Sequence, residues 1–137
     1  MRTFVDTDVL IYAHDVTERP KQQEARAVLE ELWRSGGGAL STQVLQEFYN
    51  GVTRKIPVPL TPVEARGVVA DYAQWPLVTL DLDLIVGASE LEEKLSLSFW
   101  DALIVVAARE VGADTLLSED LQHGRLIGEV RIENPFL

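Results

Sequence analysis

Short apolar runs alternate along the chain with longer segments in which apolar residues recur every three or four positions. The short runs predict β-strands at 3–5, 39–41, 77–80, 115–118 and 130–132. The longer segments predict helices at 9–13, 20–35, 43–53, 62–72, 82–94 and 98–111. Strands and helices that alternate in this way are typical of an α/β domain with a largely parallel sheet.

Residues that start or stop helices support these bounds. Thr42 is expected to cap the helix at 43–53, and Thr61 followed by Pro62 is expected to begin the next helix. The glycines at 36–38 end the helix at 20–35. Because no repeat, low-complexity tract or linker interrupts this order, we expect one domain that spans residues 1–137.

The composition narrows the class of protein. A hydrophobic fraction of 47% over 137 residues is enough to bury a core, and no apolar run is long enough to cross a membrane. The chain has no cysteine and enters a strand at once without a signal-peptide pattern, so we expect a cytoplasmic protein. A net charge of −10 argues against general nucleic-acid binding by a basic surface. It is compatible with a basic protein partner, or with an enzyme that meets phosphate through bound metal.

Four carboxylates lie where a predicted strand ends or a predicted helix begins. Asp6 closes the first strand and Asp120 follows the strand at 115–118. Glu47 and Asp101 lie near helix N-termini that could face the same edge of the sheet, where parallel α/β folds form their sites. Such acids repel one another unless protons or cations neutralise them. A cluster of hard oxygen ligands suits Mg²⁺ or Mn²⁺ and phosphodiester chemistry.

Each of these acids also has a simpler explanation. Asp6 can cap the helix that follows it, and Asp120 can close an Asx turn. Ser98 and Asp101 have the spacing of a capping box, while Glu47 can be a solvated side chain. With 22 acidic residues in the chain, coincidences of this kind are expected. Composition and spacing therefore leave the metal site open.

Four segments in a fixed order resemble the PIN-domain ribonucleases, and in particular the VapC-type toxins of toxin–antitoxin pairs. The segments are VDTDVLIYA at 5–13, LQEFY at 45–49, SFWDALI at 98–104 and LLSEDLQHG at 116–124. The resemblance implies a three-layer α/β/α sandwich with a central, mainly parallel sheet of about five strands. It also implies a metal-dependent endoribonuclease that hydrolyses RNA.

Carried over residue by residue, the resemblance assigns roles in the site. It implies that Asp6, Asp101 and Asp120 hold Mg²⁺ or Mn²⁺, with Glu47 as the remaining acid of the pocket. Such a cation would lower the pKa of a bound water and polarise the phosphodiester.

Two further residues are secondary candidates. Ser118 matches a small hydroxyl residue of the family and would orient neighbouring carboxylates by hydrogen bonding. Asp8 occupies a position where the family more often has asparagine, and it either strengthens metal binding or caps the helix.

The resemblance also implies partners. These are an RNA substrate, a second copy of the chain, and a small antitoxin whose C-terminal segment wraps the toxin and blocks the acidic pocket. An Arg or Lys of that segment could replace a metal charge there. The helices at 20–35 and 43–53 are candidate surfaces for the homodimer and the antitoxin because their apolar stripes are broad.

Two other functions fit part of the sequence. DTDV at 6–9 also fits the opening of haloacid-dehalogenase-type phosphatases, in which the first aspartate is a nucleophile. Those enzymes need a well-placed lysine, and none of Lys21, Lys55 and Lys94 follows a predicted strand. The receiver domain of a response regulator needs a similar lysine. The remaining alternative is a catalytically inert PIN-like binding module, in which the acids serve only structure or a basic partner.

Overall fold

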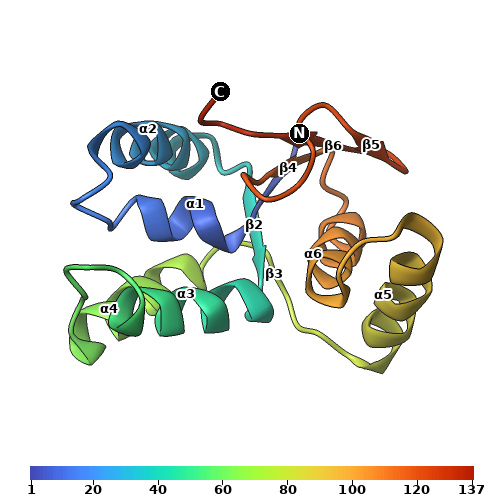
Figure 1. Ribbon diagram of the computed structural model, residues 1–137, viewed down its shortest axis with the longest axis horizontal. Helices are drawn as coiled ribbons and strands as arrows, with labels where there is room; N and C mark the ends of the chain where they lie inside the picture. The colour runs from blue at the N-terminus through green and yellow to red at the C-terminus, as the bar shows by residue number, and fades with distance from the viewer.

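A six-stranded sheet forms the centre of the molecule in the computed structural model, which describes residues 1–137 (Figure 1). The strand order is β3-β2-β1-β4-β6-β5. The strands are β1 (Thr3–Val5), β2 (Gly38–Ser41), β3 (Leu77–Val78), β4 (Thr115–Leu117), β5 (Leu126–Ile127) and β6 (Val130–Glu133). All neighbours pair in parallel except β5 and β6. The prediction of a mainly parallel sheet is confirmed, and β5 is the strand that the sequence pattern missed.

Helices cover both faces of this sheet, as the three-layer prediction requires (Figure 1). Four lie on one side: α1 (Thr7–Tyr12), α2 (Arg19–Ser35), α3 (Thr42–Arg54) and α4 (Pro62–Tyr72). Two lie on the other: α5 (Leu82–Leu95) and α6 (Phe99–Glu110). None of the six helices combines the length and the apolar character that a membrane span requires.

The helix starts follow from capping residues, with one correction to the sequence analysis. Thr61 caps α4 through a complete capping box with Glu64, as its spacing predicts. The prediction that Thr42 caps α3 is wrong, because the Ser41 hydroxyl accepts the hydrogen bond from the Val44 amide at 3.3 Å. Ser41 is the last residue of β2 and has an extended backbone, so it is the N-cap of α3 and Thr42 is the first residue of the helix.

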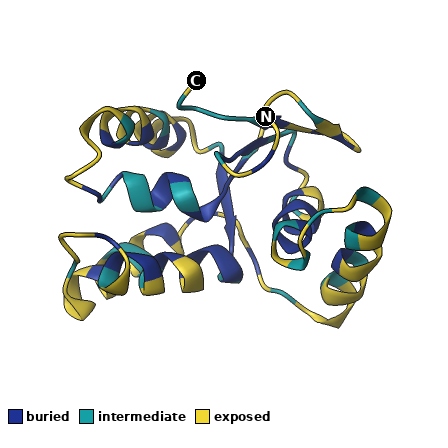
Figure 2. Cartoon of the chain, in the orientation of Figure 1, coloured by how far each residue is buried: buried dark blue, intermediate teal, exposed yellow.

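The core is one cluster of 35 buried hydrophobic residues that joins the sheet to both helical layers. Every residue from Ala102 to Ala108 is buried, so α6 is enclosed on all sides at its centre. Figure 2 shows that α1 has no exposed residue, and it contacts both α2 and α3. Gly51 permits this close approach, because an added Cβ would lie 2.6 Å from Ile11 Cδ1.

The broad apolar stripe of α3 is part of this core. Val44, Phe48 and Val52 are all fully buried within the chain. The stripe that suggested a partner surface on the helix at 43–53 is therefore explained by packing within the chain itself. On α2, Ala25 and Leu29 are buried in the same way, whereas Trp33 remains 41% exposed.

Candidate metal centre at the carboxyl edge of the sheet

The register of β1 and β4 places Asp6 beside Ser118. Val5 pairs with Leu117, so the next residue of each strand leaves the sheet at the same point of its carboxyl edge. The Ser118 hydroxyl donates to Asp6 Oδ2 at 2.8 Å, and the Thr7 amide donates to Asp6 Oδ1 at 2.7 Å. Both oxygens of the buried Asp6 carboxylate are thereby fixed. Asp6 caps α1, as the simpler explanation proposed, and it also faces the other acids.

Asp8 and Asp120 complete a tight group with Asp6. The first turn of α1 carries Asp8, whose Oδ2 accepts the Glu119 amide at 3.0 Å. The Asp120 amide donates to Ser118 Oγ at 3.2 Å. One carboxylate oxygen from each of these three aspartates lies within 4.8 Å of the other two. The structure thus places Asp8, a secondary candidate in the sequence, inside the group of acids that converges most closely.

Glu47 and Asp101 approach the group from the two helical layers, outside that 4.8 Å set. The Thr7 hydroxyl donates to Glu47 Oε1 at 2.7 Å, which links α1 to α3. The Ser98 hydroxyl accepts the Asp101 amide at 3.1 Å. The reciprocal bond of a capping box, from the Ser98 amide to the Asp101 carboxylate, is not formed, so that carboxylate does not complete the cap.

Two polar residues that the sequence analysis missed connect these acids. Thr7 joins the Asp6 and Glu47 sites through its amide and its hydroxyl. Gln43 Nε2 donates to Glu47 Oε2 at 3.4 Å and to the Trp100 carbonyl at 3.2 Å, so it ties α3 to the first turn of α6. In the sequence, Gln43 could have been recognised only because it lies one helical turn before Glu47, where the two side chains can meet.

Burial and mutual repulsion raise the pKa values of the clustered carboxyls. Desolvation by burial raises the pKa of Asp6 to about 7, against the lowering effect of the Ser118 and Thr7 hydrogen bonds. Desolvation and the charges of Asp6 and Asp120 raise the pKa of Asp8 to about 8. The pKa of Asp101 is also raised, first by burial and then by the charges of Asp120 and Glu47. In the absence of a cation, protons therefore neutralise part of the negative charge of Asp6 and Asp8 near neutral pH.

The donor set fits a hard divalent cation. It consists of carboxylate oxygens, which Mg²⁺ and Mn²⁺ prefer to nitrogen or sulfur. Asp8 Oδ1 is buried and has no hydrogen-bond partner. A buried carboxylate oxygen without a partner is costly, and a cation in the group would remove that cost.

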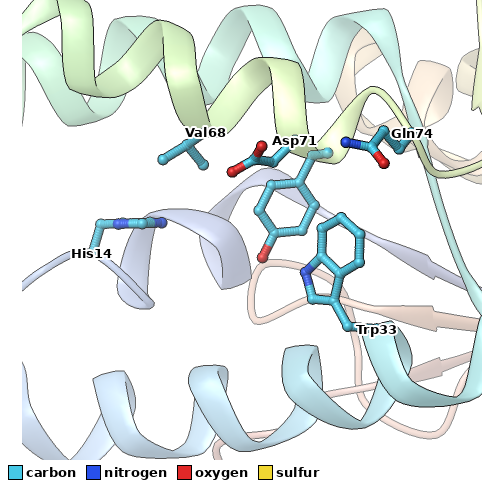
Figure 3. A pocket seen from close by; sticks show the side chains of 6 residues that line it. His14, Trp33, Val68, Asp71 and Gln74 are labelled. Atoms are coloured by element: carbon cyan, nitrogen blue, oxygen red, sulfur yellow. The ribbon is translucent and has the colours of Figure 1, made fainter.

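A concave feature away from the acids lies between α2 and α4 (Figure 3). The open hollow has a volume of about 390 Å³ and is lined by His14, Trp33, Val68, Asp71, Tyr72 and Gln74. Trp33 packs against the Tyr72 ring at 5.3 Å and the Trp75 ring at 5.1 Å between centroids. His14 follows the C-terminal end of α1, whereas the acids surround its N-terminal end. The hollow, called the α2/α4 groove below, is thus separate from the acidic group.

Solved structures with the same fold come from toxin–antitoxin systems. The VapBC2 structure from Rickettsia felis, bound to a promoter DNA fragment, matches at 21% identity over 98% of both chains, with a TM-score of 0.68. A toxin–antitoxin complex from Klebsiella pneumoniae matches at 18% identity over 97% of both chains, with a TM-score of 0.69. The Mycobacterium tuberculosis VapC20 toxin, which cleaves the sarcin-ricin loop, matches at 20% identity over 83% of this chain and 86% of its own, with a TM-score of 0.63. No curated protein matches the sequence.

The family assignment rests on the sequence itself. The PIN domain family model matches residues 3–128, which include all five acids of the site and Ser118. The match also extends from β1 to β5. The chain therefore belongs to the PIN domain family.

Proposed function

We propose that this PIN domain, spanning residues 1–137, is a metal-dependent endoribonuclease that acts in the cytoplasm as a VapC-like toxin. The observation that carries the proposal is the convergence of Asp6, Asp8 and Asp120 within 4.8 Å at the carboxyl edge of the sheet. Membership of the PIN domain family and the toxin–antitoxin neighbours support the same function.

Some side chains of the site would bind the cation, and others hold the binding carboxylates in place by hydrogen bonding. Asp6, Asp8 and Asp120 would hold Mg²⁺ or Mn²⁺, with Asp101 and Glu47 as further acids around them. When bound, such a cation makes water a stronger nucleophile and polarises the phosphodiester. Hydrogen bonds from Ser118 and Thr7 fix the plane of the Asp6 carboxylate, so it meets the cation with little reorganisation. Thr7 and Gln43 hold Glu47 in the same way.

The substrate class follows from charge and access. A chain with a net charge of −10 has little general attraction for nucleic acid, so the phosphate is met at the metal. Single-stranded or looped RNA exposes its backbone and splayed bases, which a duplex does not offer to such a site. We therefore expect cleavage within loops or single strands.

The antitoxin is proposed to cover the α2/α4 groove and the acids together. An apolar side chain of its C-terminal segment would pack on the exposed face of Trp33, and a basic side chain would pair with the acidic group. Trp33→Glu should abolish co-purification with the cognate antitoxin, while Leu126→Glu, on the edge strand β5, should not. Trp33 and Leu126 are both exposed, at 41% and 58%, so both variants are expected to fold. Co-purification of the Trp33 variant at wild-type yield would reject this surface.

The homodimer is proposed to form through α5. Leu82, Ile85 and Val86 are exposed and share one face of this helix, because Ile85 and Val86 lie three and four residues after Leu82. A second copy would bury that face. Sedimentation of the Ile85→Glu protein should show a monomer where the wild type is a dimer, and an unchanged dimer would reject the surface.

The phosphatase alternative lacks its lysine. Lys21 Nζ lies 3.0 Å from both carboxylate oxygens of Glu119 and forms an ion pair with it. A phosphatase of that type would need a lysine facing the group on Asp6. The inert binding module remains an outcome of the following experiment.

The test is cleavage of a mixed RNA pool by antitoxin-free protein with Mg²⁺, Mn²⁺ or EDTA. Wild type should cleave only with metal, Asp6→Asn should not cleave, and Glu129→Gln, which changes an exposed acid in the turn between β5 and β6, should match wild type. Cleavage that survives EDTA, or that is equal in Asp6→Asn, would refute the proposed mechanism. Metal binding without cleavage of any RNA would favour the inert module.

A further inference from the structure

The loop at 118–120 carries one of the three converging aspartates, yet that side chain has no support of its own. Asp120 is exposed, and its carboxylate makes no hydrogen bond or ion pair. Its position is therefore set by the backbone of the loop. Ser118 holds one side of that backbone through its bonds to Asp6 and to the Asp120 amide.

Glu119 is the middle residue of the same loop, and it is held through both its backbone and its side chain. Its amide donates to Asp8 Oδ2 at 3.0 Å, which ties the backbone to the acidic group. Its side chain points to Lys21, whose Nζ lies 3.0 Å from both carboxylate oxygens. The Tyr12 hydroxyl donates to Glu119 Oε1 at 3.2 Å. One residue thus links the acids to the end of α1 and the start of α2.

The ammonium group of Lys21 is itself held in place by two aromatic rings. Lys21 Nζ lies 4.8 Å from the Tyr12 ring centroid and 5.7 Å from that of Phe136. It also donates to the Tyr12 hydroxyl at 3.3 Å. The two rings meet edge to face with centroids 5.0 Å apart. Isolated surface ion pairs contribute little because long side chains remain mobile, but an ammonium held by several partners loses that freedom.

We infer that Lys21 and Tyr12 clamp Glu119 and thereby position Asp120, so that they set how tightly the acidic group binds a divalent cation. They are positioning residues, because neither touches the converging carboxylates. The inference rests on the metal site of the proposed function. Partners outside the first ring of ligands commonly change metal affinity by roughly 10–100-fold when they are removed.

The clamp makes two measurable predictions with Lys21→Met, which keeps most of the apolar stem and removes the charge. In metal-free protein, amide hydrogen exchange at Glu119 and Asp120 should become faster, because the loop is released from α2. Mn²⁺ affinity, measured by calorimetry, should fall by roughly 10-fold. Tyr12→Phe should shift both quantities in the same direction by less.

Two variants distinguish the clamp from a general loss of stability. Lys21→Arg keeps a cation opposite Glu119 and should restore most of the Mn²⁺ affinity. Lys94→Met removes an exposed lysine near the end of α5 and should leave both quantities at wild-type values. Unfolding by urea should show every variant folded under the conditions used.

The two readouts separate failure of the clamp from failure of the metal site. Unchanged exchange at Glu119 and Asp120 in Lys21→Met would overturn the clamp. Faster exchange with unchanged Mn²⁺ affinity would overturn its role in metal binding. If wild type bound no Mn²⁺, the proposed metal site would fail and the role of the clamp in metal binding would fail with it, whereas amide exchange would still decide whether Lys21 holds the loop.

Discussion

The buried Asp6 makes the stability of the metal-free protein depend on pH. Its pKa is about 7 in the folded chain against an ordinary value of 3.8, so the folded state holds the proton more tightly than the unfolded state. The resulting stability is fully present below about pH 4 and is lost as the pH rises through about 7. In the absence of metal, the protein should therefore become less stable between mildly acidic and mildly basic solution.

The size of this effect follows from the pKa difference. Each pKa unit corresponds to about 1.4 kcal/mol, so the full contribution of Asp6 is roughly 4 kcal/mol. About 3 kcal/mol of it falls between about pH 5 and about pH 8. The charge of Asp6 also raises the pKa of Asp8, so replacing Asp6 by Asn relieves part of the cost of ionising Asp8 as well.

Urea unfolding in EDTA at the two ends of this pH range measures the effect. Wild type should lose stability on going to the higher pH, and Asp6→Asn should lose about 3 kcal/mol less. Glu129→Gln should follow wild type, because this exposed acid makes no side-chain hydrogen bond. Equal losses in wild type and Asp6→Asn would refute the account of Asp6 as a buried, uncompensated acid.

Other variants test the fold and the site. Gly38→Ala should cost about 1–3 kcal/mol in urea unfolding, because its Cβ would lie 2.4 Å from the Trp75 ring. Gly67→Ala, in the middle of α4 with nothing within 4 Å of the added Cβ, should instead stabilise by about 0.5–1 kcal/mol. Ser118→Ala removes the hydrogen bond to Asp6 and should weaken Mn²⁺ binding by roughly 10-fold in calorimetry. Mg²⁺ at about 100 times its Kd should raise the free energy of unfolding of wild type by about 2.7 kcal/mol, and no rise would argue against a site in the folded state.

The sheet and its edge could be predicted because they depend on local patterns. Apolar runs located five of the six strands, and the ends of the predicted strands at 3–5 and 115–118 marked Asp6 and Asp120, whereas Ser118 was indicated only by the family resemblance. The strand β5 has only two residues and forms a hairpin with β6 around Gly128, which has a φ of 60°. A run of two residues carries no detectable period, so sequence alone could not place it.

The arrangement of the acids depended on contacts between distant residues. Asp8 could be a helix cap or a ligand until the fold placed its Oδ2 against the Glu119 amide, 111 residues away. The bond from Thr7 to Glu47 spans 40 residues, and the pair of Lys21 with Glu119 spans 98. No spacing along the chain encodes these contacts, because they arise only when α1, α2 and α3 pack on the sheet.

Anomalous diffraction from crystals soaked in Mn²⁺ would locate bound metal directly. One or two peaks bounded by the carboxylates of Asp6, Asp8 and Asp120 are expected, and Asp6→Asn crystals should lack them. Crystals without a peak at this position, at a Mn²⁺ concentration that supports RNA cleavage, would contradict the claim that these acids form the metal centre.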